Sequence, residues 1–400
     1  MTLHLPFGAV VAVSDPAAIR DLFTADPALL RAGAANAALE PVVGPESILL
    51  LDGDRHMRRR RLVLPPFHGE RLAGYAGDIA RRTAQDLERW PVDRPFALEA
   101  RMRAITLDVI LTVVFGLRSG VRADRLRALI PQVLPDGGVS SLALLPALRR
   151  DLGPWRVWGR FLQARAAVDR ELYGEIARRR ADPALGERTD VLSLLLAARD
   201  EDGTPMSDRE LRDELMTLLL AGHETTATAL AWALLLLLRR PDALARATAE
   251  VRAGGPAPYL EAAITETLRL KPPLPMAVRL SAAPVRLAGH DLPAGTRIAA
   301  CIYLAHRRPE LYPDPLAFRP ERFLAGRAAG PPISAFLPFG GGTRRCAGAA
   351  FAQLELRTVL RTVLEHVDLA PAGGPPERTR RRAVVLAPSA GARAIVAARA

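Results

Sequence analysis

Cysteine is scarce in this 400-residue chain, which contains only Cys301 and Cys346. Two cysteines so far apart do not form the disulfide framework of a small secreted domain. The chain has instead 49% hydrophobic residues, enough for a large buried core. We therefore expect a globular protein in a reducing, cytoplasmic environment, without a structural disulfide.

Lysine and aromatic residues are also scarce. Lys271 is the single lysine among 55 basic residues, and aromatic residues make up 5% of the chain. The net charge of +12 comes from arginines spread along amphipathic helical patterns. No interleaved aromatic residues accompany them for stacking on bases. The sequence therefore argues against nucleic-acid binding and favours an acidic protein partner.

Long apolar segments are limited to one region. Residues 1–13 lack the basic start and long apolar stretch of a signal peptide. Residues 215–238 are long enough to span a bilayer, but Glu224 lies in their middle with other polar residues. A carboxylate at that depth costs roughly 2.5–3.5 kcal/mol. We therefore expect a buried core helix and no membrane association, and we expect a monomer.

Hydrophobic periodicity predicts a mainly α fold with small β-sheets, in one domain over residues 1–400. Helical spacing dominates residues 17–23, 54–61, 69–90, 98–117, 154–180, 207–240, 259–270 and 349–360. Residues 8–13 alternate like a short strand. Residues 285–287 with 297–302 predict one β-hairpin, and residues 384–387 with 394–397 predict another. Residues 131–159 are apolar but interrupted by proline and glycine, which fits either core or a mobile flap over a pocket.

The segment 207–240 is the predicted central helix. Ser207 and Glu210 have the spacing of a capping box at its start, and Pro241 ends it. Its apolar middle carries Ala221-Gly222-His223-Glu224-Thr225-Thr226. Buried polar side chains need partners or a function. A threonine hydroxyl bonding back to the preceding turn would not explain Glu224, so we expect a kinked helix that opens onto a cavity.

The Cys346 loop, residues 339–348, concentrates glycine, arginine and one cysteine before a predicted helix. Glycines permit positive φ and the close approach of a bulky ligand, and a helix N-terminus stabilises a thiolate. A phosphate cradle would need a Gly-Lys-Ser/Thr ending. Zinc would need further ligands at close spacing, and a cysteine hydrolase would need a positioned histidine. The sequence identifies none of these.

Haem accounts for more residues than these alternatives. Its iron needs one thiolate from the protein, and its propionates need cations. The candidate cations are His56, Arg60, Arg279 and Arg344. His56 and Arg60 are four residues apart on a basic helical segment, where both can contact one anion, although a solvated charged face is the simpler interpretation of that segment alone.

Glu266 and Arg269 form a second pair with helical spacing. They are three residues apart, and Ile264, Leu268 and Leu270 around them are apolar. Such a pair is usually a surface ion pair of little energetic weight. The apolar neighbours indicate that this pair is partly buried and needs a further cationic partner.

Together these segments resemble the cytochrome P450 family of haem-thiolate monooxygenases, in its soluble bacterial form. The motifs that carry the resemblance follow the family's order: Ala221-Gly222-x-Glu224-Thr225-Thr226, Glu266-x-x-Arg269, the segment 318–323, and Phe339-x-x-Gly342-x-Arg344-x-Cys346-x-Gly348. The resemblance covers nearly the whole chain and is sharpest from residue 207 to residue 351. The chain departs from many bacterial relatives at His306, where they have asparagine.

The resemblance implies haem b as the cofactor and a role for each matching residue. Cys346 is then the iron ligand, and Phe339 shields its sulfur. The other cofactor-binding residues implied are His56, Arg60, Ala221, Arg279, Arg344 and Gly348. Glu224 and Thr225 are the acid and the alcohol that organise water and deliver protons to dioxygen. Arg322 is the cation that completes the network of Glu266 and Arg269.

The resemblance also implies the reaction and the partners. One oxygen atom from O2 is inserted into an apolar small molecule, by hydroxylation or epoxidation. A separate ferredoxin or flavodoxin supplies electrons and docks on a basic surface. The alternatives are a haem-thiolate peroxygenase or isomerase, and a non-catalytic haem sensor, which has no need of the acid and the alcohol.

The substrate is expected to contact apolar walls. These walls are assigned to residues 41–51, the 131–159 flap, Ala221, residues 274–278 and the turn at Pro388-Ser389. The apolar lining residues among them are Val42, Val43, Ile48, Leu274, Met276 and Val278. Such a lining predicts a fatty-acyl, terpenoid or polyketide-like substrate.

Overall fold

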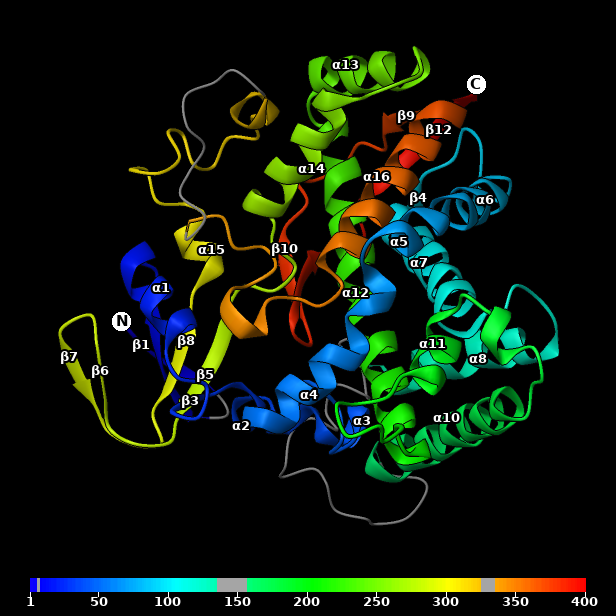
Figure 1. The fold of residues 1–400 in the computed structure, drawn as a ribbon. Helices are drawn as coiled ribbons and strands as arrows, with labels where there is room; N and C mark the ends of the chain where they lie inside the picture. Colours follow the sequence, from blue (N-terminus) through cyan, green and yellow to red (C-terminus); the bar gives the residue numbers. More distant parts are fainter. Residues whose placement is uncertain (6–7, 135–156, 325–334) are drawn as a thin grey trace.

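The computed structural model describes residues 1–5, 8–134, 157–324 and 335–400. Helices dominate, as the periodicity predicts (Figure 1). The longer ones are α1 (Pro16–Thr24), α4 (Gly53–Val63), α6 (Ala76–Leu87), α7 (Leu98–Phe115), α8 (Val121–Val133), α10 (Val157–Arg180), α12 (Asp208–Leu238), α13 (Pro241–Arg252), α14 (Pro258–Leu270) and α16 (Ala349–His366). Short helices are α2 (Ala32–Ala35), α3 (Glu40–Val43), α5 (Glu70–Gly74), α11 (Val191–Ala197) and α15 (Ile302–Ala305). The predicted flap falls largely on residues 135–156, outside the described residues.

Helix α12 runs through the centre of the molecule (Figure 1). Its predicted capping box is confirmed: Ser207 Oγ accepts from the Glu210 N–H, and the Glu210 carboxylate accepts from the Ser207 N–H at 2.8 Å. Such a cap contributes typically about 1 kcal/mol. The most apolar stretch of α12 is long enough to span a membrane, but 72% of it is buried inside the protein. It is therefore a core helix, packed against α7, α10, α14 and α16.

The strands form small sheets beside the helices. Their bounds are β1 (Thr2–Leu5), β2 (Gly8–Val13), β3 (Leu30–Arg31), β4 (Phe96–Ala97), β5 (Ala277–Ser281), β6 (Val285–Leu287), β7 (His290–Leu292), β8 (Arg297–Ala300), β9 (Val367–Pro371), β10 (Thr379–Arg382), β11 (Val385–Pro388) and β12 (Arg393–Arg399). Within the described ranges, the largest sheet has the order β1-β2-β8-β5-β3, in which β2 and β8 are parallel. In Figure 1 this sheet lies with α1 at the left, while α6, α7, α8 and α10 lie at the right.

Both predicted hairpins have the wrong partners. Strand β6 pairs with β7 across a turn at Ala288 and Gly289, both with positive φ, whereas β8 pairs with β2 and β5. Strand β11 pairs with β10, and β12 pairs with β4 and β9. Alternation along a strand shows which residues share a face, but it does not specify the neighbouring strand. The predicted helix over residues 69–90 is also divided, into α5 and α6.

Candidate active site

The Cys346 loop is folded back on itself in front of α16. The Cys346 N–H donates to the Phe339 carbonyl at 2.9 Å, and the Gly340 N–H donates to the Leu337 carbonyl at 3.0 Å. Helix α16 begins three residues after Cys346, with Gly348 as its N-cap. The backbone thus places Phe339 beside Cys346 and presents the thiol close to the start of a helix.

Two of the loop glycines serve a different purpose from the one the sequence suggested. A Cβ on Gly341 would lie 2.6 Å from the ring of Phe23, and a Cβ on Gly342 would lie 2.0 Å from the Phe23 carbonyl oxygen. Gly342 also has φ +64°. These glycines therefore let the loop approach α1, whereas a ligand was expected to occupy that space.

Cys346 is surrounded by protein, yet it is exposed to solvent. Burial raises the pKa of its thiol, while a hydrogen bond from the Gly348 N–H and the charges of Arg60 and Arg345 oppose the increase. A group can be both desolvated and accessible when it lines a hollow. The environment therefore favours a neutral thiol over the free thiolate, and ionisation requires a further partner such as a metal ion.

Three arginines and a histidine meet near Cys346, and they are the four side chains that the sequence singled out. Burial and the charges of Arg344, Arg60 and Arg279 together lower the pKa of His56 to about 4, against the opposing effect of Asp52. Burial also lowers the pKa of Arg279, to about 10, and that of Arg60. These pKa shifts share one physical cause: basic groups are held together away from water.

The charge balance of this cation cluster calls for an anion. Arg344 pairs with Asp52 at 2.6 Å. In the part of the chain that the structure describes, no carboxylate pairs with Arg60 or Arg279, and the Arg279 guanidinium donates to the Val278 carbonyl. Buried arginines without carboxylate partners match an anionic ligand. The two propionates of haem fit this requirement, beside a thiol suited to ligate its iron.

Helix α12 presents an open face in its middle. Nearly all of its side chains are buried, but Ala221 is exposed and Leu218, Gly222 and Thr225 are half-buried. These four residues follow the i, i+3, i+4, i+7 spacing of one helix face. The helix continues without interruption from Asp208 to Leu238. The opening that the sequence predicted at a kink is instead this face, which carries small side chains along a continuous helix.

Gly222 and Thr225 have their own local partners. A Cβ on Gly222 would lie 2.8 Å from Ile110 Cδ1, so this glycine lets α7 pack closely against α12. The Thr225 hydroxyl donates to the Ala221 carbonyl at 2.6 Å. The sequence allowed a threonine hydroxyl that bonds back to the preceding turn, and Thr225 makes this bond on the open face.

Glu224 is held by arginines from distant segments. Arg382 of β10 donates to Glu224 Oε2 at 2.8 Å, and Arg103 of α7 lies 2.7 Å from Glu224 Oε1. Arg382 also forms an ion pair with Glu99. The adjacent His223 shares a hydrogen bond with the Thr106 hydroxyl at 2.8 Å. Glu224 therefore belongs to a buried charge network, here named the Glu224 network (Glu99, Arg103, Glu224, Arg382), and its carboxylate is bonded to arginine rather than to Thr225.

No motif in the sequence indicated Arg103, Arg382 or Glu99. Arg382 ends a run of basic residues, Arg380-Arg381-Arg382, which has the appearance of a solvated charged strand. Only Arg382 of this run is buried.

The predicted buried pair of Glu266 and Arg269 is confirmed, and so is its third member. Arg269 donates to both oxygens of Glu266, at 2.7 and 2.8 Å, and Arg322 Nε donates to Glu266 Oε1 at 3.1 Å. Arg269 and Glu266 are both fully buried. We name Glu266, Arg269 and Arg322 the Glu266 network.

His306 connects the Glu266 network to the Cys346 loop. Its Nδ1 lies 3.1 Å from the Arg269 carbonyl oxygen, and its Nε2 accepts from the Leu337 N–H at 2.8 Å. Burial lowers the pKa of His306 to about 3, which keeps the ring neutral. The departure from the family pattern thus falls at a residue that positions the start of the loop.

Two expected substrate-lining residues are in the core. Val42 and Val43 are 0% exposed and belong to the main hydrophobic cluster. They leave no surface for a substrate, because α3 packs against α12. Leu274 is exposed, and Met276 and Val278 are half-buried, so these three remain available as lining residues.

The mainly helical fold, the cysteine in a folded loop and the partly buried cations near it fit haem bound through a thiolate. The sequence profile of the cytochrome P450 family matches residues 1–394. This chain belongs to the cytochrome P450 family, and its cofactor is haem bound through a thiolate.

Relatives and solved structures agree with this assignment. The chain is 45% identical to cytochrome P450 135B1 of Mycobacterium tuberculosis over 399 residues, which covers 98% of this chain and 83% of that protein. It is 44% identical to cytochrome P450 137 of the same organism over 389 residues, covering 97% and 81%. Retinoic-acid-bound cyanobacterial CYP120A1 superposes with a TM-score of 0.87 at 28% identity, covering 98% of this chain and 90% of that one.

Proposed function

We propose that this P450 is a monooxygenase that inserts one oxygen atom from O2 into an apolar small molecule, by hydroxylation or epoxidation. The observation that carries the proposal is the meeting of Cys346 with partly buried cations in a chain whose central helix has an open face. Haem, when bound, supplies oxygen activation and the oxidising chemistry. The protein supplies the thiolate, the cations and the protons.

Cys346 is assigned as the iron ligand, with Phe339 and Gly348 beside it. The Gly348 N–H already donates to the sulfur and stabilises its negative charge. Arg60, Arg279 and Arg344, with neutral His56, are assigned to the propionates. Ala221 leaves room on the other face of the cofactor, because its side chain is a single methyl group.

Glu224 and Thr225 are assigned to proton delivery. Thr225 Oγ1 lies on the open face, where it can hold a water molecule. Glu224 is buried, but its partner Arg103 has a side chain that is 25% exposed. A proton can therefore pass from the surface near Arg103 to Glu224 and on to water at Thr225.

Electrons come from a separate acidic protein, a ferredoxin or a flavodoxin. Arg55, Arg58 and Arg61 project from α4 with side chains that are 68%, 60% and 53% exposed, and they pair at the surface with Glu46, Asp200 and Glu201 respectively. The same helix carries Arg60, which interacts with Cys346. A basic surface so close to the iron ligand suits an acidic donor, and we propose that both proteins meet in the cytoplasm.

The substrate class is inferred from the apolar lining residues that remain once Val42 and Val43 are assigned to the core. Leu274, Met276 and Val278 leave an apolar lining, and the structural relative CYP120A1 binds retinoic acid, an apolar chain with one carboxylate. We propose a fatty-acyl, terpenoid or polyketide-like substrate, and retinoids and long-chain fatty acids are the first compounds for a spectral binding screen.

The test is turnover under isotopically labelled O2 with a ferredoxin, its reductase and NADPH. We expect a product that contains one labelled oxygen atom, dependent on the electron donor. Product formed only with added hydrogen peroxide would favour a peroxygenase, and a rearranged product without label would favour an isomerase. Haem-dependent partner binding without turnover of any compound would favour a sensor.

A further inference from the structure

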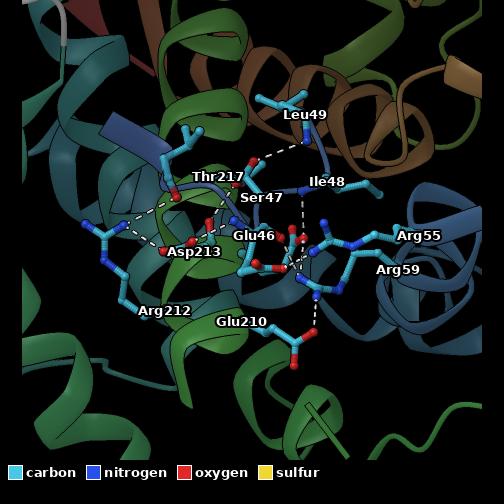
Figure 2. A network of polar contacts seen from close by, with 12 residues as sticks. Glu46, Ser47, Ile48, Leu49, Arg55, Arg59, Glu210, Arg212, Asp213 and Thr217 are labelled. Carbon is cyan, nitrogen blue, oxygen red and sulfur yellow. Dashed lines mark hydrogen bonds and ion pairs between the residues drawn. The ribbon is translucent and has the colours of Figure 1, made fainter. Parts of the chain in front are cut away.

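The segment 46–52, between α3 and α4, is bonded to α12 through its N–H groups (Figure 2). The Glu46 N–H donates to Asp213 Oδ2 at 2.9 Å, and the Ile48 N–H donates to Glu214 Oε1 at 2.8 Å. The hydroxyls of Ser47 and Thr217 share a hydrogen bond of 2.6 Å. Consecutive polar groups of α12 therefore hold one side of this segment.

The carbonyl groups of the same segment are bonded to the Cys346 loop. Arg344 donates to the Ile48 carbonyl at 3.1 Å, to the Leu51 carbonyl and to Asp52 Oδ1 at 2.6 Å. Ile48 thus donates to Glu214 and accepts from Arg344. It links a carboxylate on the central helix to a guanidinium in the cation cluster.

Glu214 is buried, so its carboxylate depends on the groups of this link for hydrogen bonds. Its side chain is 0% exposed, and Arg59 lies 3.1 Å from the same oxygen that accepts from Ile48. Arg59 also donates to the Glu46 carbonyl at 2.7 Å, so it holds the segment a second time. Within the described part of the chain, Glu214 Oε2 has no hydrogen-bond partner. Because the carboxylate is buried, its orientation depends on the bonds from Ile48 and Arg59.

Gly44 provides independent evidence for this close approach. It has φ +85°, and a Cβ at this position would lie 2.1 Å from the Asp213 carboxylate. Only glycine satisfies both conditions without rearrangement. The backbone in front of the segment is therefore shaped to bring it against the carboxylates of α12.

We propose that Glu214 is a positioning residue for the cofactor: through Ile48 it holds the Arg344 guanidinium in the orientation that binds a haem propionate. Glu214 does not touch the haem itself. The inference rests on the proposed assignment of Arg344 to a propionate, and it adds a residue that no motif of the chain indicates. Arg344 would otherwise be free to choose among several carbonyl acceptors, because a guanidinium has five N–H donors.

The test measures haem release from the full-length holoprotein to an excess of apomyoglobin, in wild type and in E214L, E214Q and E210Q. Glu214→Leu removes the acceptor of the Ile48 N–H, and we expect haem release to accelerate roughly 10- to 100-fold, the usual effect of losing such a partner. Glu214→Gln keeps an acceptor oxygen and should lie close to wild type. Glu210→Gln is the matched control, since Glu210 contacts Arg59 one turn away but does not contact the segment.

A double-variant comparison shows whether the effect passes through Arg344. We expect E214L and R344Q together to release haem no faster than R344Q alone. Additive effects, or wild-type release from E214L, would overturn the inference. If E214L does not fold, Thr217→Val replaces it in the comparison with R344Q, because it removes the hydrogen bond between Ser47 and α12. We expect this variant to accelerate haem release by a smaller factor. A wild-type protein without a thiolate-type haem spectrum would instead refute the proposed function.

Discussion

The Glu266 network and the Glu224 network are both buried groups of carboxylates and arginines, but they differ in how completely their atoms are bonded. Both oxygens of Glu266 accept hydrogen bonds, and Arg269 also donates to the carbonyls of His306, Pro315 and Ala317. In the Glu224 network, Arg382 Nε and Glu224 Oε1 have no aligned hydrogen bond within the described residues.

This difference separates a structural role from a functional one. A fully bonded buried network has one stable arrangement, and removing a member leaves a charge without compensation. The Glu266 network therefore fixes the segment that leads to Cys346. An incompletely bonded network can exchange partners or protons at lower cost. The Glu224 network has this property next to the open face of α12, where the proposed function requires protons.

Arg269→Leu should have the largest effect on stability. It leaves Glu266 buried with Arg322 and one backbone N–H, and we expect the free energy of unfolding to fall by about 3–5 kcal/mol. Urea unfolding followed by circular dichroism measures the change. Arg286→Leu is the control, because Arg286 and Asp291 form an exposed pair at 3.9 Å and should contribute under about 1 kcal/mol. Equal effects of the two variants would contradict the role given to the Glu266 network.

Glu214 is intermediate between the two networks in its hydrogen bonding, because one of its oxygens accepts hydrogen bonds and the other has no partner within the described residues. Its contribution to the free energy of unfolding should depend on pH. Burial raises its pKa from 4.5 to about 7, while Arg59 and the Ile48 N–H oppose the increase and Asp213 adds to it. Between these two pKa values the Glu214 carboxyl is protonated in the folded state and ionised in the unfolded chain. The free energy of unfolding therefore falls as the pH rises through this range.

Glu214→Gln removes this dependence. We compare the free energies of unfolding of wild type and E214Q. As the pH rises from the unfolded-state pKa to the folded-state pKa of Glu214, we expect the wild-type value to fall by about 3 kcal/mol relative to that of E214Q, with no further change at higher pH. Urea unfolding at a series of pH values measures the difference. A difference that stays constant with pH, or one that grows with pH, would show that Glu214 is ionised throughout.

Glu224→Gln should cost less stability, about 2 kcal/mol, the size of a hydrogen bond to a charged group. Arg382 keeps Glu99, and Arg103 reaches solvent, so no cation is left alone. Product formation should nevertheless fall roughly 100-fold, because a proton donor is lost. Glu99→Gln tests the comparison within the same network, and it should lower activity less than E224Q. Full activity of E224Q would remove Glu224 from proton delivery.

Thr225→Ala should change stability least, by under about 1 kcal/mol, since its hydroxyl bonds only to its own helix. We expect more of the consumed O2 to appear as hydrogen peroxide and less as product. Thr226→Ala is the matched control, because Thr226 is buried and lies off the open face. Peroxide yield per molecule of NADPH separates the two, and equal yields in both variants would contradict the role of Thr225.

Local sequence patterns predicted the parts of the site that lie in short contiguous motifs. The Ser207 capping box, the central helix and the Glu266–Arg269 pair are of this kind, because helix geometry and burial decide them. Their partner Arg322 was implied by the resemblance to the family. The cation cluster near Cys346 was also anticipated, since the propionates of haem need cations.

The partners that come from distant segments were not predictable in the same way. Arg382 meets Glu224 from 158 residues further along the chain, and its neighbours in sequence are exposed. The strand partners of β8 and β12 depend on the assembled sheets. The glycines of the Cys346 loop show that local flexibility does not reveal what occupies the space, here the ring and backbone of Phe23.

The central claim is that Cys346 ligates haem iron as a thiolate. The most direct measurement is the absorption spectrum of the reduced, carbon-monoxide-bound protein, for wild type and for Cys346→Ser with Cys301→Ser as control. The account predicts the red-shifted Soret band of thiolate ligation in wild type and C301S, and its loss in C346S. A histidine-type spectrum in wild type, or an unchanged spectrum in C346S, would contradict it.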